Sequence, residues 1–260
     1  MTNNEIHKIA LSQSAIDCHC EPKDFLKNSP VVTLSRASCK SRKYLPLPLE
    51  CDMVSYGSNI VAQVSPRTRE AVETFLKGAD PAHAFETPEI YRLNQLLEPF
   101  GLKVCFMAEY FLPDLDKLKA LSCPYPMEVL TPEDFSALYT KEWSNALCAD
   151  RKSLDKIAIG AYDQGRLVGL AGASADCETM YQIGVDVLPD YRRQGIASAL
   201  TSHLALEILK LGKVPFYCAA WCNVKSAGNA VKCGFTPAWA ELTARDEEFV
   251  EKLMKDVSLP

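Results

Sequence analysis

From Met127 onward, the hydrophobic and polar positions follow a pattern of short strands and helices. The segments "KIAIGAY" and "RLVGLAGASA" are apolar runs of strand length, and the "DQG" between them is typical of a hairpin turn. A further strand, "MYQIGVDVLP", ends at Pro189, which cannot donate a hydrogen bond to a neighbouring strand. The spacing then becomes helical and predicts a helix that ends at Gly212, with an apolar face made by Ile196, Leu200, Leu204, Ile208 and Leu211.

The remaining segments of this half alternate in the same way. "MEVL" predicts a short strand, and Thr131 followed by Pro132 is typical of the start of a helix. We expect that helix within residues 131–147, where Phe135, Leu138, Tyr139 and Trp143 recur at helical spacing. "VPFYCAAW" predicts a strand, "NVKSAGNAVKCG" a short helix from Asn223 to Gly234, and "FTPAWAELTAR" a closing strand.

The first half of the chain also mixes strands with helices. "YLPLPLECDMVSYGSNIVAQVS" contains two strand-like runs separated by a turn at Gly57. A helix follows, for which we expect Ser65 as the N-cap, Pro66 in the first turn and Gly78 at the end. "TPEIYRLNQLLEPFG" predicts a second helix, and "LKVCFMAEYFL" a buried strand after it.

These patterns predict an α/β (α+β) protein of two domains. At 260 residues the chain is longer than one typical domain, and a proline-bearing passage near 123–126 marks the boundary. We expect an N-terminal α/β domain of unassigned role over residues 1–122 and a second domain over residues 126–260. The segment "IVAQVSPRTREAVETFL" loosely repeats the later order of strand, proline, basic turn and helix, so the first half is also a candidate for a decayed copy of the second.

Composition narrows the class of protein. With 48% hydrophobic and 23% charged residues the chain is typical of a globular protein, and its net charge of −5 argues against nucleic acid as a partner. The N-terminus lacks the charged and apolar regions of a secretion signal, and no apolar run reaches the roughly 20 residues of a membrane span. We therefore expect a cytoplasmic protein with no membrane partner.

The eleven cysteines are scattered without regular spacing, and in a chain of this length they are expected to be reduced thiols. Cys18, His19 and Cys20, with Cys39 and Cys51 downstream, suggest a metal site at first sight. They lack the paired CxxC spacing that zinc sites use, so no metal is predicted.

The turn between the strand "IGVDVLP" and the next helix has the chemistry of an anion site. The N–H groups at the start of a helix have no intrahelical acceptor, and the helix dipole favours an anion there. Gly195 allows a phosphate to approach the backbone, Ala197 keeps the next turn slim, and Arg192 and Arg193 add positive charge. The segment therefore predicts phosphate binding.

Two motifs here resemble the GNAT superfamily of acyl-CoA-dependent N-acetyltransferases. Arg192 to Ala197 fit the family's Q/RxxGxG/A motif, and "NVKSAGNAVKCGF" fits NxxSxxxAxKxGF. The resemblance covers the chain from about Met127. It implies a GNAT-like mixed, mostly antiparallel twisted sheet flanked by helices, with the smaller N-terminal α/β domain before it.

The resemblance also implies where acetyl-CoA binds. The pyrophosphate would lie on the amides from Arg193 to Ser198, pantetheine would extend along Val185 to Leu188, and an N–H near Val187 would stabilise the oxyanion. A neutral amine would then attack the acetyl carbon directly. The implied cofactor-binding residues are Val185, Val187, Leu188, Arg192, Arg193, Gln194, Gly195, Ile196, Ala197, Ser198, Asn223 and Ser226.

The catalytic residues are less clearly indicated. Many family members carry a Tyr four residues before the GF pair, where this chain has Ala230, so the proton donor has to be another group. Ser226, Asn223 and Tyr217 are the candidates. For a base, Tyr181 stands where some relatives carry a Glu, and Asp186 or Glu178 could act through water. Strand parity puts Tyr181 on the opposite face from Asp186.

The sequence thus predicts an N-acetyltransferase that transfers an acetyl group from acetyl-CoA to a primary amine, without a metal. The alternative is a non-catalytic acyl-CoA-binding or sensing protein. The acidic balance favours a cationic acceptor, either a small molecule such as a polyamine or aminoglycoside or a lysine-bearing peptide. The first half would shape the acceptor pocket or form a homodimer interface.

Overall fold

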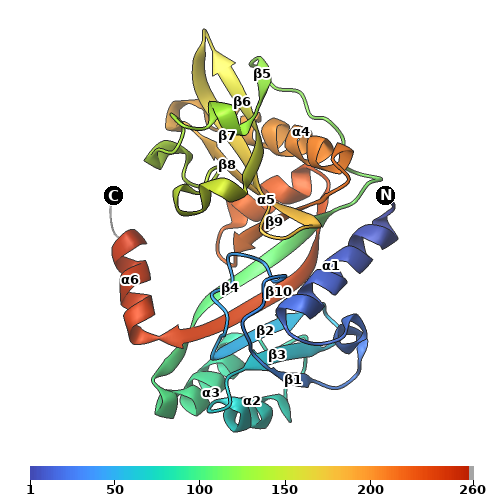
Figure 1. Cartoon of the computed structure of the whole chain (residues 1–260), viewed down its shortest axis with the longest axis vertical. Helices are drawn as coiled ribbons and strands as arrows, with labels where there is room; N and C mark the ends of the chain where they lie inside the picture. Colours follow the sequence, from blue (N-terminus) through green and yellow to red (C-terminus); the bar gives the residue numbers. More distant parts are fainter. Residues whose placement is uncertain (258–260) are drawn as a thin grey trace. The chain divides into compact units, whose positions relative to one another are not determined.

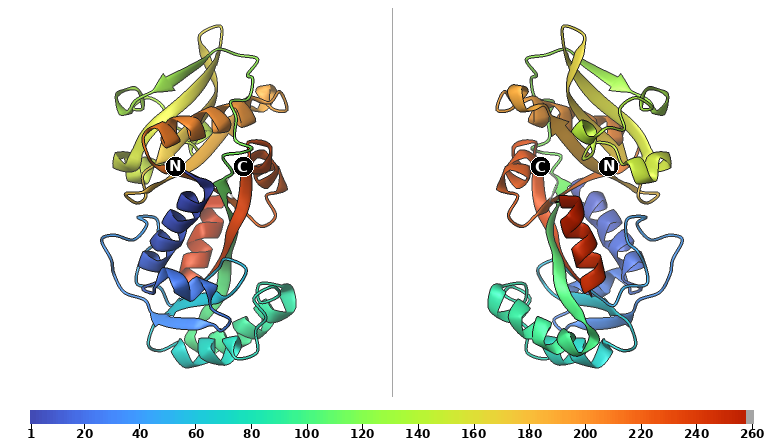
Figure 2. Two further views of the ribbon diagram at one scale, coloured as in Figure 1. Left: turned by 90° about the vertical axis from the view of Figure 1, so that its right-hand side faces the viewer. Right: turned by 90° about the vertical axis from the view of Figure 1, so that its left-hand side faces the viewer.

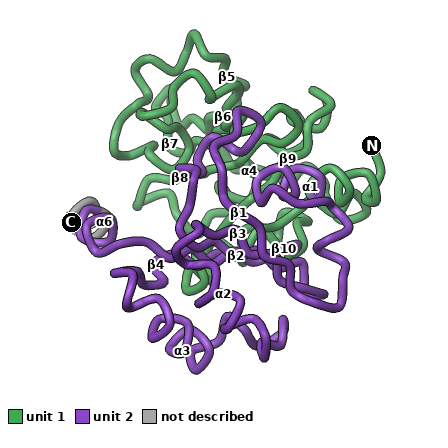
Figure 3. Tube along the Cα trace, turned by 60° about the horizontal axis from the view of Figure 1, so that its bottom comes forward, with its two compact units in different colours: residues 1–10, 110–237 green, residues 11–109, 238–260 purple. Residues whose placement is uncertain are grey.

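We analysed a computed structural model of the whole chain, which describes residues 1–257 and the side chains of residues 1–252. The chain divides into two compact units (Figure 3). Unit 1 comprises residues 1–10 and 110–237, and unit 2 comprises residues 11–109 and 238–260. Three elements contribute residues to both units: α1 (Asn3–Asp17), β4 (Leu102–Pro113) and β10 (Phe235–Asp246). The prediction of separate domains at 1–122 and 126–260 stays a prediction.

Unit 1 is built on a mixed sheet with the strand order β9-β8-β7-β6-β5 (Figure 1). The strands are β5 (Met127–Leu130), β6 (Asp155–Asp163), β7 (Arg166–Ser174), β8 (Met180–Val187) and β9 (Val214–Ala220). Neighbouring strands are antiparallel except for β8 and β9, which are parallel. The predicted mixed, mostly antiparallel sheet is confirmed.

Two helices of unit 1 follow the strands that the sequence analysis assigned to them. α4 (Ile196–Lys210) packs against β6, β7 and β8, as Figure 1 and Figure 2 show, and α5 (Val224–Lys232) packs against β9 and α4. Gly169 makes room for α4, because a Cβ there would press on the side chains of Ile196 and Leu200. This close approach sets the start of α4 beside the end of β8.

The β6–β7 hairpin confirms the predicted turn. Gln164 and Gly165 both have positive φ, 48° and 82°, which is the conformation that two-residue hairpin turns need. Beyond β7, β8 pairs antiparallel along its length, from Gln182 opposite Ser174 to Val187 opposite Gly169.

The helix predicted within residues 131–147 is wrong. This stretch forms 3-10 turns at Pro132–Asp134 and Lys141–Trp143, and another follows at Ala149–Leu154. Phe135 and Trp143 are buried, as the pattern suggested, but in a small cluster against β6 and β7 rather than along one helical face. The backbone carbonyls of Asn145 and Ala146 lie directly against Gly184 and Gly172 of the sheet.

The strands of unit 2 pair in the order β1-β3-β2-β10, with both parallel and antiparallel neighbours. Its strands are β1 (Val31–Leu34), β2 (Cys51–Ser55) and β3 (Ile60–Val64), together with the unit 2 part of β10. β1 is parallel to β3, whereas β2 pairs antiparallel with both β3 and β10. The turn between β2 and β3 contains Gly57 at φ 93°, as expected.

The helices of unit 2 are α2 (Arg69–Leu76), α3 (Thr87–Leu97) and α6 (Glu247–Val257). α2 and α3 pack together and bury Phe75, Leu93 and Leu97. The expected N-cap at Ser65 is wrong: α2 begins one turn later, with Thr68 at the cap position. The sequence analysis did not predict α1 or α6. Within the described residues, none of the helices combines the length and the apolar character needed to cross a membrane.

Candidate functional site

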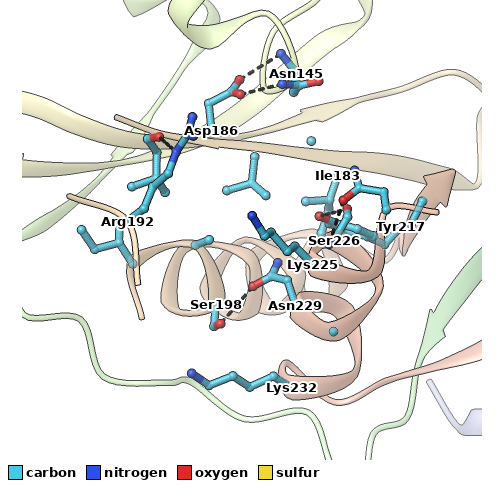
Figure 4. A pocket seen from close by; sticks show the side chains of 18 of the residues that line it. Asn145, Ile183, Asp186, Arg192, Ser198, Tyr217, Lys225, Ser226, Asn229 and Lys232 are labelled. Carbon is cyan, nitrogen blue, oxygen red and sulfur yellow. Dashed lines mark hydrogen bonds between the residues drawn. The ribbon is translucent and has the colours of Figure 1, made fainter. Parts of the chain in front are cut away.

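β8 and β9 separate part-way along their length. They pair in parallel only from Met180 to Ile183 and from Val214 to Tyr217. β8 continues beyond that point against β7, so its other edge has no strand partner within the described residues after Ile183. A cavity of about 840 Å³ lies at this fork, lined by residues of β8, β9, α4 and α5 (Figure 4). Backbone groups on an unpaired strand edge are available to a ligand in extended conformation.

The turn from β8 to α4 forms one wall of the cavity. Arg193 and Gly195 both adopt the left-handed conformation, with φ of 63° and 86°, and Gly195 is the N-cap of α4. Successive backbone N–H groups around such residues form an anion-binding concavity. The first α4 amide with a backbone acceptor is that of Ala199, which donates to Gly195 O at 3.0 Å. A Cβ built on Gly195 would have nothing within 4 Å, so the turn is open.

The charges around the cavity are mostly positive. Arg192, Arg193, Lys225 and Lys232 line it, against one carboxylate, Asp186. Arg192 is held across the turn by donation from its Nε to Val187 O at 3.0 Å. The chain as a whole carries a net charge of −5, so the cavity lining is opposite in charge to the chain average, and it favours an anionic ligand.

The α5 wall carries a network of hydroxyl and amide groups. The hydroxyls of Tyr217 and Ser226 lie 2.9 Å apart, and Asn223 caps α5 by accepting from Ser226 N. Ser198 in the first turn of α4 donates to Asn229 in the second half of α5 at 2.9 Å, which links the two helices. Tyr217 is almost fully buried, and this burial raises the pKa of its phenol above the ordinary value. Its hydroxyl therefore keeps its proton at neutral pH.

Asn145 and Asp186 form a further wall, on the other side of β8 (Figure 4). Asp186 Oδ2 accepts from the backbone N–H groups of Asn145 and Ala146, each at 2.9 Å, and Oδ1 accepts from Asn145 Nδ2 at 2.6 Å. The carboxylate thus holds a segment from a distant part of the sequence against the strand that forms the fork.

The GNAT acetyltransferase family model matches residues 102–239, which is more than half of the chain and includes every element that lines the cavity. The chain belongs to the GNAT acetyltransferase family. The resemblance drawn from the two motifs is therefore confirmed. Membership of this family suggests acyl transfer as the general class of activity.

Solved structures similar to this GNAT protein include GCN5-related N-acetyltransferases. The Kribbella flavida enzyme is 15% identical over 59% of this chain and 63% of its own, with a TM-score of 0.47. The Sphaerobacter thermophilus enzyme is 16% identical over 72% and 71%, with a TM-score of 0.46. A GCN5-related N-acetyltransferase-like protein from Streptococcus suis is 22% identical over 59% and 68%, also at 0.46.

The match spans 66% of a further GNAT-family acetyltransferase structure, from Novosphingobium aromaticivorans, which is 18% identical over 55% of this chain with a TM-score of 0.41. No curated protein matches this sequence.

Most of the residues that the GNAT motifs suggested lie together at the fork. The cavity is lined by Val185, Asp186, Val187, Arg192, Arg193, Gly195, Ile196, Ala197, Ser198, Asn223 and Ser226. Tyr181, Leu188 and Gln194 are not among the described residues that line it. Tyr181 packs against the apolar core of unit 1, and Gln194 accepts a hydrogen bond from Tyr125 and reaches the backbone oxygen of Asp190. Their assignments stay predictions.

Several lining residues of this GNAT site were not singled out from the sequence. Lys225, Gly228 and Asn229 lie at helical spacing on α5 with Lys232, a residue of the second motif, so the periodicity of that motif could have revealed them. Asn145 carried no comparable signal, because its position depends on residues far away in the sequence. Within the described residues there is no group of three or more His, Cys, Asp or Glu side chains placed to hold a metal ion.

Proposed function

We propose that this protein is an N-acetyltransferase that moves an acetyl group from acetyl-CoA to a primary amine. The observation that carries the proposal is the cavity at the β8–β9 fork, which joins an open anion-binding turn to an unpaired strand edge. In CoA a pyrophosphate joins the adenosine part to an extended, amide-bearing pantetheine arm that ends in the thiol. The two kinds of wall match these two parts of the molecule.

The residues around the turn fit the phosphates of CoA. The backbone N–H groups from Arg193 to Ser198 would donate hydrogen bonds to the pyrophosphate, because a left-handed turn and a helix start direct N–H groups outward together. The four cationic side chains of the cavity would add charge-assisted contacts. Pantetheine would extend along Val185 to Leu188 on the β8 edge, and an N–H near Val187 would polarise the thioester carbonyl.

The reaction needs positioning and proton transfer rather than a covalent enzyme intermediate. A neutral amine attacks the acetyl carbon, the C–N bond forms, the C–S bond breaks, and CoA leaves as the thiolate. The amine releases one proton, and the thiolate takes one up. Ala230 is fully buried and bears no hydroxyl, so it cannot supply this proton.

We assign the proton donor to Tyr217 acting with Ser226. Their hydroxyls lie 2.9 Å apart on the cavity wall, and the raised pKa keeps Tyr217 protonated until the thiolate forms. Ser226 can then donate to the phenolate oxygen. The proton lost by the amine would pass to water, because both oxygens of Asp186 already accept hydrogen bonds from the protein.

The test is calorimetry with acetyl-CoA, followed by thiol release from acetyl-CoA in the presence of a polyamine, an aminoglycoside or a lysine-containing peptide. We expect binding of acetyl-CoA, and CoA release that depends on one of the amines. Binding without turnover on any amine would favour the acyl-CoA sensor, and an absence of binding would contradict the site itself.

A further inference from the structure

The cavity at the fork is lined from both faces of the sheet. Alternate residues of a strand point to opposite faces. Ile183 and Val185 of β8 pack with the core residues beneath α4, whereas Gly184 and Asp186 face the Asn145 segment. Ile196 and Asn145 line the same cavity from these two sides. The open anion-binding turn lies at the start of α4, so the side at Asn145 is left for the acceptor.

Two glycines allow the Asn145 segment to lie directly on the strands. Gly172 of β7 and Gly184 of β8 are paired across the sheet. A Cβ on Gly184 would overlap with the carbonyl oxygen of Asn145, and a Cβ on Gly172 would overlap with that of Ala146. The segment therefore approaches the sheet more closely than any residue with a side chain would permit at these two positions.

The carboxylate of Asp186 fixes the orientation of the segment and of its one side chain in the cavity. Two hydrogen bonds come from the backbone, and the third comes from Asn145 Nδ2. Because a carboxylate can only accept, the amide of Asn145 must turn its nitrogen toward Asp186 and its oxygen away. Asn145 Oδ1 has no hydrogen-bond partner in the part of the chain that the structure describes, and the residue is exposed on the cavity wall.

We infer that Asp186 is a positioning residue that holds Asn145 in place, and that Asn145 Oδ1 receives an N–H of the acceptor amine. This inference rests on the proposed function. The three hydrogen bonds and the two glycines together then hold one acceptor oxygen fixed, on the side of the fork opposite the phosphate turn. A general base has to face the proton that it removes, whereas both oxygens of Asp186 face N–H groups of the protein.

Three variants test this inference by different routes. Asp186→Asn replaces an oxygen that accepts hydrogen bonds with an NH2 group that faces other donors. Gly184→Ala keeps the carboxylate but pushes the Asn145 carbonyl off the strand. Asn145→Ala removes only the amide and keeps both backbone hydrogen bonds to Asp186. Asp150→Asn, at an exposed carboxylate of the next 3-10 turn, and Gly78→Ala in unit 2 are the matched controls.

The measurements are the KM and kcat for the amine that the thiol-release assay identifies, the Kd of acetyl-CoA by calorimetry, and thermal unfolding of each variant. We expect all three test variants to raise the amine KM about tenfold, the effect of losing one well-aligned hydrogen bond. The kcat should change less, and the Kd of acetyl-CoA should stay within about twofold. Both controls should keep the wild-type values.

The pH dependence of kcat/KM separates positioning from base catalysis. If Asp186 only positions Asn145, the Asp186→Asn profile keeps its shape at a lower level. Asp186 would instead be the base if Asp186→Asn lost one limb of the pH profile and its kcat collapsed, while Gly184→Ala kept its kcat. That result would overturn the inference. An unchanged amine KM in folded Asn145→Ala would overturn it as well, while leaving the transferase intact. A wild-type protein that acetylates no amine would remove both proposals together.

Discussion

Two strand-to-helix connections in this chain share a sequence pattern, but they differ in whether their polar groups are paired within the protein. Both β3 to α2 and β8 to α4 contain a proline and basic residues between a strand and a helix. In unit 2, Arg67 forms an ion pair with Glu50, and Thr68 donates its hydroxyl to the Glu50 carbonyl. In unit 1, Arg193 and Gly195 are left-handed, and Arg193 makes no ion pair among the described residues.

The difference shows that basic residues before a helix do not by themselves make an anion site. The β3–α2 turn satisfies its own polar groups, and Thr68 is completely buried. The β8–α4 turn directs its N–H groups into open space, because two of its residues have positive φ. A glycine that permits the left-handed conformation therefore distinguishes the two, and its absence from the β3–α2 turn argues against a second cofactor site.

Removing the open turn is expected to have the largest effect. Gly195→Glu introduces a carboxylate at the phosphate position, and a residue with a Cβ at φ 86° costs about 1–2 kcal/mol in backbone strain. We expect the Kd of acetyl-CoA, measured by calorimetry, to rise by more than about 100-fold, since like charges and lost amide contacts act together.

Gly195→Asn is the matched control, because Asn tolerates the left-handed conformation and carries no charge. It should weaken binding far less than Gly195→Glu does. Equal losses in the two variants would mean that backbone strain, rather than the anion site, explains the effect. Wild-type affinity in folded Gly195→Glu would refute the assignment of the turn.

A second contrast lies in two tyrosine–serine pairs, one in each unit. Tyr217 and Ser226 lie 2.9 Å apart on the cavity wall, and Tyr56 and Ser14 lie 2.8 Å apart in unit 2. We expect Tyr217→Phe to lower kcat about 100-fold, the lower end of the range for general acids, because thiolate is a good leaving group. Thiol release at saturating acetyl-CoA and amine measures this.

Tyr56→Phe loses the same hydroxyl in unit 2 and should leave kcat unchanged. If Tyr217→Phe also kept its kcat, the proton would have to come from Ser226 or from water. Ser226→Ala then decides between these two sources, since only the first would be lost in that variant.

The sequence predicted the elements around the β8–β9 fork better than the segment at Asn145 that faces them. The strands of unit 1, the hairpin at Gln164 and the start of α4 all follow from local patterns and are confirmed. The position of Asn145 could not be predicted, because it depends on Gly172, Gly184 and Asp186, which lie far along the chain. Helical spacing alone cannot separate a continuous helix from 3-10 turns whose apolar residues pack into one small cluster.

α1 was missed for a related reason. Its buried apolar residues are few, and two of the four are alanines: Ile6, Ala10, Leu11 and Ala15. Gln13 and Asp17 are buried polar residues on the same helix. Asp17 is paired with Arg42 at 2.6 Å, so the polar positions that hide the pattern are satisfied by tertiary contacts. No local rule would reveal such a pairing.

The buried carboxylate of Asp52 in unit 2 should make the stability of the protein depend on pH without affecting the ligand. Burial raises the pKa of Asp52 from its ordinary 3.8 to about 6, and the nearby charge of Asp17 adds to this, although Thr243 and Gln63 donate hydrogen bonds that lower it. Because the folded protein holds this proton more tightly, the stabilisation is full below about pH 4 and is lost as pH rises through 6.

Asp52→Asn removes this dependence. At pH 7.5 we expect the variant to be more stable than the wild type by about 1–3 kcal/mol, and the difference to vanish near pH 4. Urea unfolding of both proteins at the two pH values measures it. A difference that does not vary with pH would contradict the expected titration, and an altered Kd of acetyl-CoA would contradict the separation of Asp52 from the cavity.

The smallest effect is expected in the β3–α2 turn, where the Thr68 hydroxyl is hydrogen-bonded within the protein. Thr68→Ala deletes a buried hydroxyl that donates to the Glu50 carbonyl, at a cost of about 1–2 kcal/mol in unfolding free energy. Thr68→Ser keeps the hydroxyl and should recover most of that loss, which separates the hydrogen bond from methyl packing. Neither variant should change the Kd of acetyl-CoA, because this turn uses its polar groups internally. A weaker Kd in Thr68→Ala alone would show that the two turns are less distinct than their backbone conformations imply.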